Sequence, residues 1–266
     1  MEDVKRRPTE IRKIFLSVMI FLITCFLVYF TIMSVLSSQR KITEINNNFG
    51  YVPSDNNPLD ERLFTDSVYV NLEKKHSFFQ SRLRMAKSDS IGLTINLLDS
   101  LASLELNGVV IHKTKIKRSS VCNLFNLANT YAVNSMFSIP FNISNDFSTI
   151  RKEPLMIKMA PKDTSEYQPD IIPDTSGFEP VNYILEMDNG IRIFIFQEKF
   201  DKKSEKRAQL LFDFNYRVRT TLLALKDMAG FQVPDYRMYI KIWIPKADAK
   251  IIYRAMPKQG QVVVYR

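Results

Sequence analysis

Residues 91–116 read IGLTINLLDSLASLELNGVVIHKTKI, and this stretch decides the fold class of the chain. From residue 91 to residue 97 apolar side chains alternate with small or polar ones, which is the two-residue period of a half-buried strand. A second apolar run over residues 101–106 predicts a returning strand. Asn107-Gly108 is a strong hairpin signal that leads into a third strand over residues 109–116. We therefore expect a three-stranded meander.

The chain after this meander predicts further strands and one long helix. Residues 119–150 show no clear period, and residues 160–180, with four prolines and five acids, predict a long loop. The other expected elements are a strand at 155–159, a hairpin of 181–187 and 191–196 around Asn189-Gly190, a helix at 203–229 capped by Gly230, a strand at 238–244, a helix at 247–255 and a strand at 262–265. The apolar face expected for the long helix contains Ala208, Leu211, Phe212, Val218, Leu222, Leu225 and Ala229. Residues 88–266 are thus predicted to form one β-rich α+β domain.

Before the meander, residues 58–87 predict an amphipathic helix. Asn57-Pro58 offers an N-cap followed by proline at the first helical position. Apolar residues then recur at helical spacing, with His76 in the same stripe: Val68, Leu72, Phe79, Leu83 and Ala86. Two interpretations stay open. The stripe either packs on its own domain, where His76 is a half-buried packing residue, or joins copies of the chain in a homo-oligomer.

Residues 14–36 read IFLSVMIFLITCFLVYFTIMSVL, 23 residues without a charge. A helix rises about 1.5 Å per residue, so about 20 apolar residues cross the hydrocarbon core of a bilayer. A cleaved signal peptide is the rival, but its apolar region is shorter and ends at small residues, and no Ala-x-Ala-like site follows Leu36. The stretch therefore predicts a transmembrane helix, with the lipid bilayer as its partner.

The basic residues that flank this helix predict its direction. Five of them lie in residues 1–13, whereas only Arg40 and Lys41 occur between residue 37 and Arg62. The positive-inside bias makes residues 1–13 a cytoplasmic tail, followed beyond the membrane by a polar tether at 37–57 and the main domain. We expect the inner membrane of a bacterium, with the main domain on the periplasmic or extracellular side.

The composition excludes several common kinds of site. The closest of the seven glycines, Gly177 and Gly190, are 13 residues apart, so no glycine-rich dinucleotide or phosphate loop can form. Cys25 lies in the membrane span and Cys122 outside it, so the two cannot make a Cys-x-x-Cys site. With two histidines and a scattered net charge of +9, we expect no metal, no cofactor and no nucleic-acid partner.

No catalytic set stands out in the sequence. Cys122 lacks a recognisable activating neighbourhood, and no Gly-x-Ser-x-Gly elbow occurs. An enzyme would have to depend on Cys122 with His112, ten residues away, on elements whose contact the sequence leaves open.

Two stretches of the sequence, one at each end of the predicted domain, carry a family resemblance. The first comprises residues 91–100 with Leu104-Glu-Leu-Asn-Gly-Val-Val-Ile-His112. The second comprises Ile244-Pro-Lys-Ala-Asp-Ala-Lys-Ile-Ile-Tyr-Arg254 and Pro257-Lys-Gln-Gly-Gln-Val-Val-Val264. They resemble the opening strand-hairpin unit and the closing Asp-Ala helix and Gly-x-x-Val strand of the L,D-transpeptidase (YkuD-like) catalytic domain. These motifs bracket residues 88–266, and their order implies a YkuD-like outline there.

The sequence departs from this family at the nucleophile. The family's cysteine lies in a Ser-x-Gly-Cys-(Ile/Val)-Arg motif, seven residues before the Asp of the Asp-Ala pair, and Lys241 stands at that position. Ile240 and Trp243 replace the glycine and the arginine, and no His-Gly dipeptide occurs. A thiolate, its base and its oxyanion site are thus all missing. The resemblance implies a noncatalytic copy whose groove, with Tyr239, Lys241 and Trp243, binds rather than reacts.

These observations predict a membrane-anchored pseudoenzyme, not an enzyme, that binds peptidoglycan or another envelope protein. The alternative is a structural subunit of a membrane-spanning secretion or division complex, in which residues 58–87 drive self-association. A cell-wall enzyme built on Cys122 is the third hypothesis.

Overall fold

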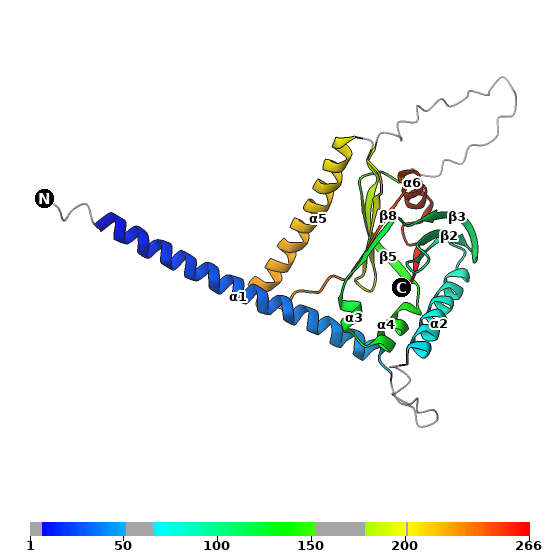
Figure 1. The fold of residues 1–266 in the computed structure, drawn as a ribbon, viewed down its shortest axis with the longest axis horizontal. Coiled ribbons are helices and arrows are strands. Elements are labelled where there is room, and N and C mark those ends of the chain that lie inside the picture. The colour runs from blue at the N-terminus through cyan, green and yellow to red at the C-terminus, as the bar shows by residue number, and fades with distance from the viewer. Residues whose placement is uncertain (1–6, 52–65, 153–178, 201) are drawn as a thin grey trace, which may run out of the picture. The chain divides into compact units, whose positions relative to one another are not determined.

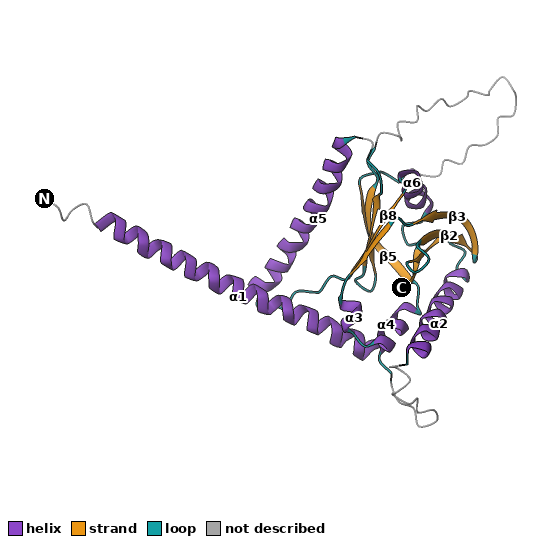
Figure 2. Cartoon of the chain, in the orientation of Figure 1, coloured by secondary structure: helices purple, strands orange, loops and turns teal. Residues whose placement is uncertain are grey.

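The computed structural model describes residues 7–51, 66–152, 179–200 and 202–266 (Figure 1). The chain divides into two compact units. One comprises residues 1–44 and 217–236, and the other comprises residues 45–216 and 237–266. Helices and a large sheet occur together, which confirms the predicted α+β class with a long apolar helix near the N-terminus (Figure 2).

The larger unit is built around one mixed sheet. Its described strands are hydrogen-bonded in the order β3-β2-β1-β9-β5-β6-β7-β8-β4. Their bounds are β1 Gly92–Asn96, β2 Leu101–Leu106, β3 Val109–Lys115, β4 Arg118–Val121, β5 Phe141–Ser148, β6 Asn182–Met187, β7 Arg192–Gln197, β8 Tyr239–Ile244 and β9 Gln261–Tyr265. The predicted meander β1-β2-β3 and the predicted hairpin β6-β7 are both confirmed.

The sheet curls so that its two ends approach each other. Its end strands β3 and β4 are separated by only two residues of chain, so Lys115 and Arg118 cannot lie more than about 11 Å apart. Both linking residues pair with the sheet: the Ile116 amide donates to the Ser100 carbonyl at 2.8 Å, and the Lys117 amide donates to the Trp243 carbonyl at 2.9 Å. The chain therefore passes directly from one end of the strand order to the other.

Parallel neighbours in the sheet require crossover connections. Strands β7 and β8 are parallel, and helix α5 (Lys203–Ala229) lies between them in sequence, as the predicted bounds had it. The last strand, β9, is parallel to β1 and antiparallel to β5. Helix α6 (Lys246–Ala255), also predicted, leads from β8 towards β9.

Helix α2 (Ser67–Ala86) contradicts one of the two interpretations of its apolar stripe, that the stripe packs on its own domain. Its buried residues are Ser77, Phe78, Ser81 and Met85, and Phe78 and Met85 pack with Val263 of β9. The predicted stripe points outward, and His76 with it: Val68, Leu72, Phe79 and Leu83 are 59–64% exposed. Small serines let α2 lie close to the sheet, so the longer apolar residues are left on the far side.

The predicted apolar face of helix α5 is confirmed only in part. Of that face, Leu211, Val218 and Leu222 are 40–60% exposed. Phe212, which belongs to the predicted face, packs on the sheet together with Tyr216, which does not. The sheet face beneath it is aromatic, and offset or edge contacts between aromatic rings favour those two residues over the aliphatic ones.

Residues 119–150, for which no element was predicted, hold part of β4, the strand β5 and two short helices, α3 (Leu124–Leu127) and α4 (Thr130–Phe137). Asn129 caps α4, because its side-chain oxygen accepts from the amides of Tyr131 and Ala132. These elements are too short to show a period. The strand predicted at 155–159 and most of the loop predicted at 160–180 lie outside the described residues.

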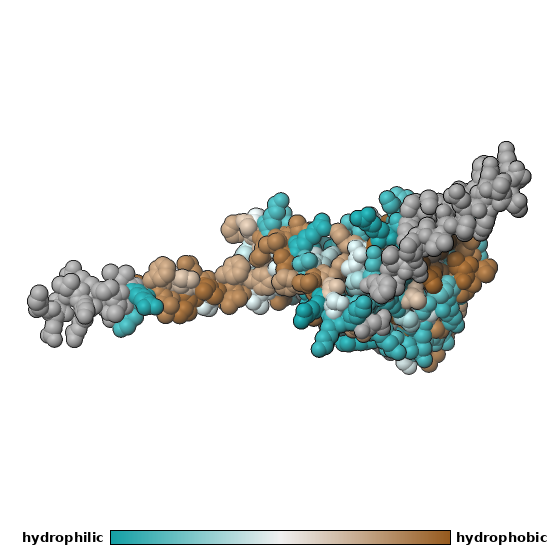
Figure 3. Space-filling model, turned by 90° about the horizontal axis from the view of Figure 1, so that it is seen from above, coloured by the Kyte–Doolittle hydropathy of each residue, from teal (hydrophilic) through white to brown (hydrophobic). Residues whose placement is uncertain are grey.

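Helix α1 (Arg7–Phe49) contains the predicted membrane span. Residues 37–49, predicted as an irregular tether, continue the helix instead, because its backbone ladder runs through these polar residues without a break. Threonine hydroxyls at 24 and 31 donate to the carbonyls four residues earlier, at 2.9 Å and 2.7 Å, which satisfies them without water. By length and composition α1 can cross a membrane, although a signal sequence meets the same criterion. Figure 3 shows the apolar surface of this helix beyond the grey N-terminal residues.

The β2-β3 hairpin provides a test of the fold. Asn107 (φ 51°) and Gly108 (φ 80°) both adopt the left-handed conformation of a tight hairpin turn. Replacing Gly108 by Ala adds a Cβ where φ is positive, so we expect the free energy of unfolding to fall by about 1 kcal/mol. Gly230, whose φ is not in that region, is the control: Gly230→Ala should change stability by less than about 0.5 kcal/mol. Urea unfolding of the detergent-solubilised chain measures both. Equal effects of the two changes would contradict this turn.

Candidate functional site

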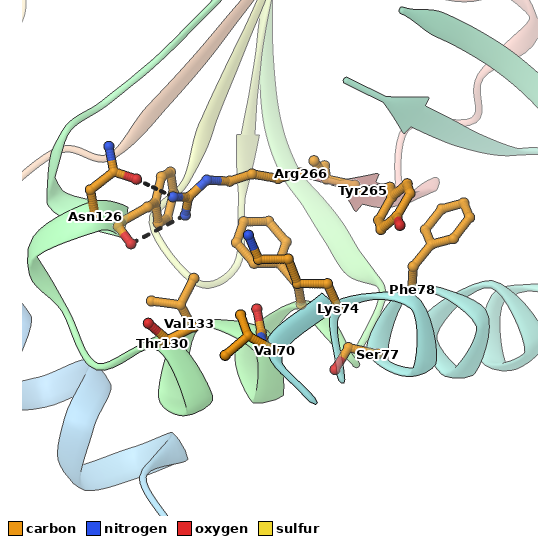
Figure 4. Close-up of a pocket in the computed structure, with 13 residues that line it drawn as sticks. Val70, Lys74, Ser77, Phe78, Asn126, Thr130, Val133, Tyr265 and Arg266 are labelled. Carbon is orange, nitrogen blue, oxygen red and sulfur yellow. Dashed lines mark hydrogen bonds between the residues drawn. The ribbon is translucent and has the colours of Figure 1, made fainter. Parts of the chain in front are cut away.

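A cavity of about 220 Å³ lies in the larger unit between α2, the short helices α3 and α4, and the end of β9 (Figure 4). It is lined by Val70, Lys74, Ser77, Phe78, Phe125, Asn126, Thr130, Val133, Asn134, Phe137, Val264, Tyr265 and Arg266. Two cations, two amides, three hydroxyl side chains (one of them that of Tyr265) and several aromatic rings thus face one space.

Arg266 forms one end of the cavity. Its guanidinium donates to the Phe125 carbonyl at 3.3 Å and to the side-chain oxygen of Asn126, and lies 5.1 Å from the centre of the Phe125 ring (Figure 4). Burial lowers the pKa of Arg266, while the nearby Cys122 acts in the opposite direction. A guanidinium has an ordinary pKa so far above neutrality that this side chain stays a cation at pH 7. The described carboxylates form no ion pair with it that would neutralise the charge.

Helix α2 forms the opposite wall. Phe78 stacks on Tyr265 with the ring centres 4.7 Å apart, and this pair holds α2 against the end of β9. One turn before Phe78, Lys74 is half-buried and extends into the cavity (Figure 4). The close approach of α2 to the sheet therefore places a second cation opposite Arg266.

This arrangement favours a ligand that combines negative charge with apolar surface. Ammonium and guanidinium groups bind carboxylates through charge-assisted hydrogen bonds, which are stronger when partly shielded from water. The amides of Asn126 and Asn134 and the hydroxyls of Ser77 and Thr130 can bond to peptide groups. Phe78, Phe125 and Phe137 supply apolar contact. The cavity thus has the chemistry to hold a short peptide that ends in a carboxylate.

The predicted groove residues lie elsewhere. Tyr239, Lys241 and Trp243 share one face of β8, where burial alternates along the strand. Tyr239 and Trp243 pack with Phe194, Phe196 and other aromatic residues beneath the first half of α5. The Lys241 ammonium lies 3.7 Å from the Asp213 carboxylate and 4.7 Å from the centre of the Phe194 ring. These three side chains therefore belong to an aromatic layer between sheet and helix, and they do not line the cavity.

One carboxylate anchors α5 to this layer. The Glu186 side chain on β6 accepts from Arg192 on β7 and from the Tyr216 hydroxyl on α5, both at 2.8 Å to the same oxygen. Burial raises the pKa of Glu186, but the hydrogen bonds from Arg192 and Tyr216 outweigh it, and the net pKa is lowered. The same contact and burial raise the pKa of Tyr216. Glu186 is therefore charged in the folded chain at neutral pH.

Cys122 and His112 have different partners. Cys122 is buried, and its amide pairs with the Tyr239 carbonyl. His112 Nε2 lies 3.0 Å from one oxygen of Asp248, and the Thr114 hydroxyl donates to the other at 2.6 Å. Asp248 stands in the first turn of α6, so this cluster joins the start of that helix to the end strand β3. Within the described ranges no three His, Cys, Asp or Glu residues are grouped as a metal site would need.

Comparison of the chain with protein-family models, with curated proteins and with solved structures finds no match. What the cavity could bind therefore has to be inferred from the residues that line it.

The sequence contained part of the signal for the cavity. Asn129 before Thr130 is an N-cap signal for α4, and Lys74 stands one turn before Phe78 on a predicted helix. Arg266 and Asn126 show no motif, because they are 140 residues apart and meet only when β9 takes its place in the sheet.

The Glu186 contacts predict a pH dependence of stability. A carboxylate whose pKa is lowered on folding stabilises the fold above its unfolded pKa, near 4.5, and this contribution disappears as the pH falls through the folded value. We expect Glu186→Gln to lower the free energy of unfolding by about 1 kcal/mol at pH 7, and by progressively less below pH about 4. Urea unfolding at several pH values checks this. The exposed Asp89→Asn should show neither effect, and a pH-independent loss in Glu186→Gln would contradict the role of the charge.

Proposed function

We propose that this chain is a membrane-anchored, noncatalytic protein of the bacterial cell envelope, whose domain outside the membrane binds peptidoglycan. In this proposal α1 lies in the inner membrane with its N-terminus in the cytoplasm. The main domain is periplasmic or extracellular, and an envelope protein is the other partner considered.

The anchor is supported by α1 and its flanking charges. The apolar side chains of the helix are exposed along the span, as a lipid-facing helix requires. Five basic residues precede the span, which favours a cytoplasmic N-terminus.

The cavity is the observation that carries the binding function. Peptidoglycan stem peptides are short and carry free carboxylates, which suit Lys74 and Arg266, while the amide and aromatic lining suits peptide groups and alkyl side chains. Held rigidly between α2 and β9, these groups lose little freedom on binding.

The order of the elements supports a degenerate L,D-transpeptidase-like outline. A meander opens the domain, and a short Asp-Ala helix followed by a central strand closes it. At the position of the family's nucleophile, Lys241 lies against Phe194 and Asp213 under α5, an environment that offers no thiol. We infer that the domain has lost the catalytic site of such enzymes and binds its ligand at a different place, the cavity between α2 and the end of β9.

Retention on purified sacculi tests this proposal. The full chain in detergent should sediment with sacculi, and Lys74→Glu should weaken retention about tenfold, because it places a negative charge opposite the ligand's carboxylate. Lys75→Glu is the matched control: it makes the same charge change one residue away on the exposed side of α2, and should bind as the parent does.

Two outcomes would contradict the proposal. Equal weakening by Lys74→Glu and Lys75→Glu would show attraction by net charge alone, and would exclude the cavity. Failure of the parent chain to bind sacculi would exclude peptidoglycan. Cross-linking of that chain to an envelope protein, lost in Lys74→Glu, would then support the protein partner.

A second function is favoured by the outer face of α2. Val68, Leu72, Phe79 and Leu83 are 59–64% exposed and lie along one face of the helix, with His76 between them. Such a stripe joins helices in homo-oligomers, as a structural subunit of a secretion or division complex would require.

Self-association is tested by measuring the mass of the chain in mild detergent. We expect an oligomer for the parent chain and a monomer for the double change Leu72→Glu and Phe79→Glu, because two charges would be buried in the interface. Leu127→Glu is the control, since Leu127 is 70% exposed on α3 and outside the stripe. A monomeric parent chain would contradict this second function.

A further inference from the structure

In the smaller unit the end of α5 lies against the membrane-spanning part of α1 (Figure 1). The Tyr29 hydroxyl donates to the Met228 carbonyl at 2.7 Å, and the Tyr29 ring meets Phe231 edge-on with the centres 6.4 Å apart. The contact joins residues about 200 positions apart in the sequence, so it fixes where the turn after α5 lies along α1.

Tyr29 lies within the apolar run, seven residues before its last residue, Leu36. At about 1.5 Å per residue, Tyr29 is about 10 Å inside the end of the span. If α1 crosses the bilayer through residues 14–36, then Phe231 reaches below the lipid surface. The depth of Phe231 does not depend on the direction in which α1 crosses the bilayer. In either direction residues 217–236 lie near the same end of the apolar run.

A second contact shows where the chain leaves this depth. The ammonium of Lys41 lies 3.8 Å from the Asp235 carboxylate and 3.0 Å from that of Glu44. Lys41 stands five residues beyond Leu36, about 7 Å past the apolar run, where charged groups meet lipid headgroups and water. From Phe231 to Asp235 the chain therefore runs along α1 from the apolar span to its polar continuation.

Three carbonyls at the end of α5 have hydrogen-bond partners within the chain, which lowers the cost of placing this end in lipid. The Gly230 amide donates to the carbonyls of Lys226 and Asp227, and the Gln232 amide also donates to the Asp227 carbonyl at 2.9 Å. Met228 accepts from the Phe231 amide at 2.9 Å as well as from Tyr29. Three of the four carbonyls that a helix end leaves unpaired, those of Lys226, Asp227 and Met228, thus have partners here.

The side chains around this turn are apolar and exposed. Phe231 is 83% exposed, Leu222 60% and Leu223 47%. Phe231 also has φ 54°, a left-handed conformation that costs a bulky residue about 1 kcal/mol. The residue before it is Gly230, but the left-handed position falls on the phenylalanine and not on the glycine. The chain thus holds an aromatic ring outward at a position where glycine would be easier. Basic residues accompany them: Arg217, Arg219 and Lys226.

We propose that residues 218–231 are a second membrane contact, in which Phe231, Leu222 and Leu223 enter the lipid leaflet from which the C-terminal end of α1 emerges. The basic side chains reach the anionic headgroups, since long cationic side chains extend towards the surface from shallow depth. The inference rests on the proposed anchor and deepens it: the domain is held to the bilayer at two points. Lipid is favoured over a second copy of the chain because Tyr29 sets the depth of Phe231.

Depth-dependent quenching of tryptophan fluorescence tests this contact in the full chain. The chain is reconstituted into vesicles of phosphatidylethanolamine and phosphatidylglycerol that contain nitroxide-labelled lipid, with the label near the headgroup or deep in the acyl chain. Trp243 is the one tryptophan, so the parent signal is subtracted from each variant. The reporters are Phe231→Trp, Phe21→Trp within the span, and Phe79→Trp on α2, each replacing an aromatic residue that is 59–83% exposed.

We expect Phe231→Trp to be quenched about twofold by the shallow label and less by the deep one, as for a group 5–10 Å below the headgroups. Phe21→Trp should be quenched by the deep label, and Phe79→Trp by neither. Quenching of Phe21→Trp without Phe231→Trp would overturn the second contact and leave the anchor standing. Absence of quenching in Phe21→Trp would overturn the anchor itself. Quenching of Phe231→Trp that disappears as the protein-to-lipid ratio rises would assign this face to a second copy and overturn the lipid contact.

Discussion

The hydrogen bonds of β9 hold the larger unit together. This strand pairs with β1 on one side and with β5 on the other, so it joins the opening meander to the rest of the sheet. Val262, Val263 and Val264 are at most 1% exposed, and α2 packs on Val263 through Phe78 and Met85. Because Tyr265 and Arg266 follow directly, the same pairing places the two residues that complete the cavity.

The two regions that were candidates for ligand binding lie at different places in the sheet, one beside β8 and the other at the end of β9. On the side of β8, α5 covers the strand with an aromatic layer in which Tyr239, Lys241 and Trp243 are packing residues. At the end of β9 the covering helices α2 and α4 leave a space, because their serine, threonine and asparagine side chains are short. The space at the end of β9 is therefore the one offered for recognition, whereas Lys241 on β8 belongs to the packed layer under α5.

Prediction from the sequence succeeded where one local pattern decides the outcome. The alternation over β1, the turn at Asn107-Gly108 and the bounds of α5 all follow from neighbouring residues, and all were confirmed. The sequence did not decide which faces of the helices α2 and α5 are buried. The stripe of α2, for which two interpretations stayed open, points outward, and the predicted face of α5 is buried only in part, since periodicity identifies an apolar face without identifying what covers it. The apolar faces left outside the fold are those for which a membrane or another chain is proposed as partner.

The amino-acid sequence alone determined the α+β class, the apolar span, the hairpins and the absence of glycine-rich loops, because each depends on residues within about one element of one another. Only the tertiary structure decided the cavity and the contact of Phe231 with Tyr29. Arg266 meets Asn126 across 140 residues, and Tyr29 meets Met228 across 199. Contacts of this kind depend on the pairing of β9 and on the path of α5, which no local pattern specifies. In this chain local sequence patterns predicted most of the elements outside residues 119–150, and the long-range pairing of the elements defines the sites.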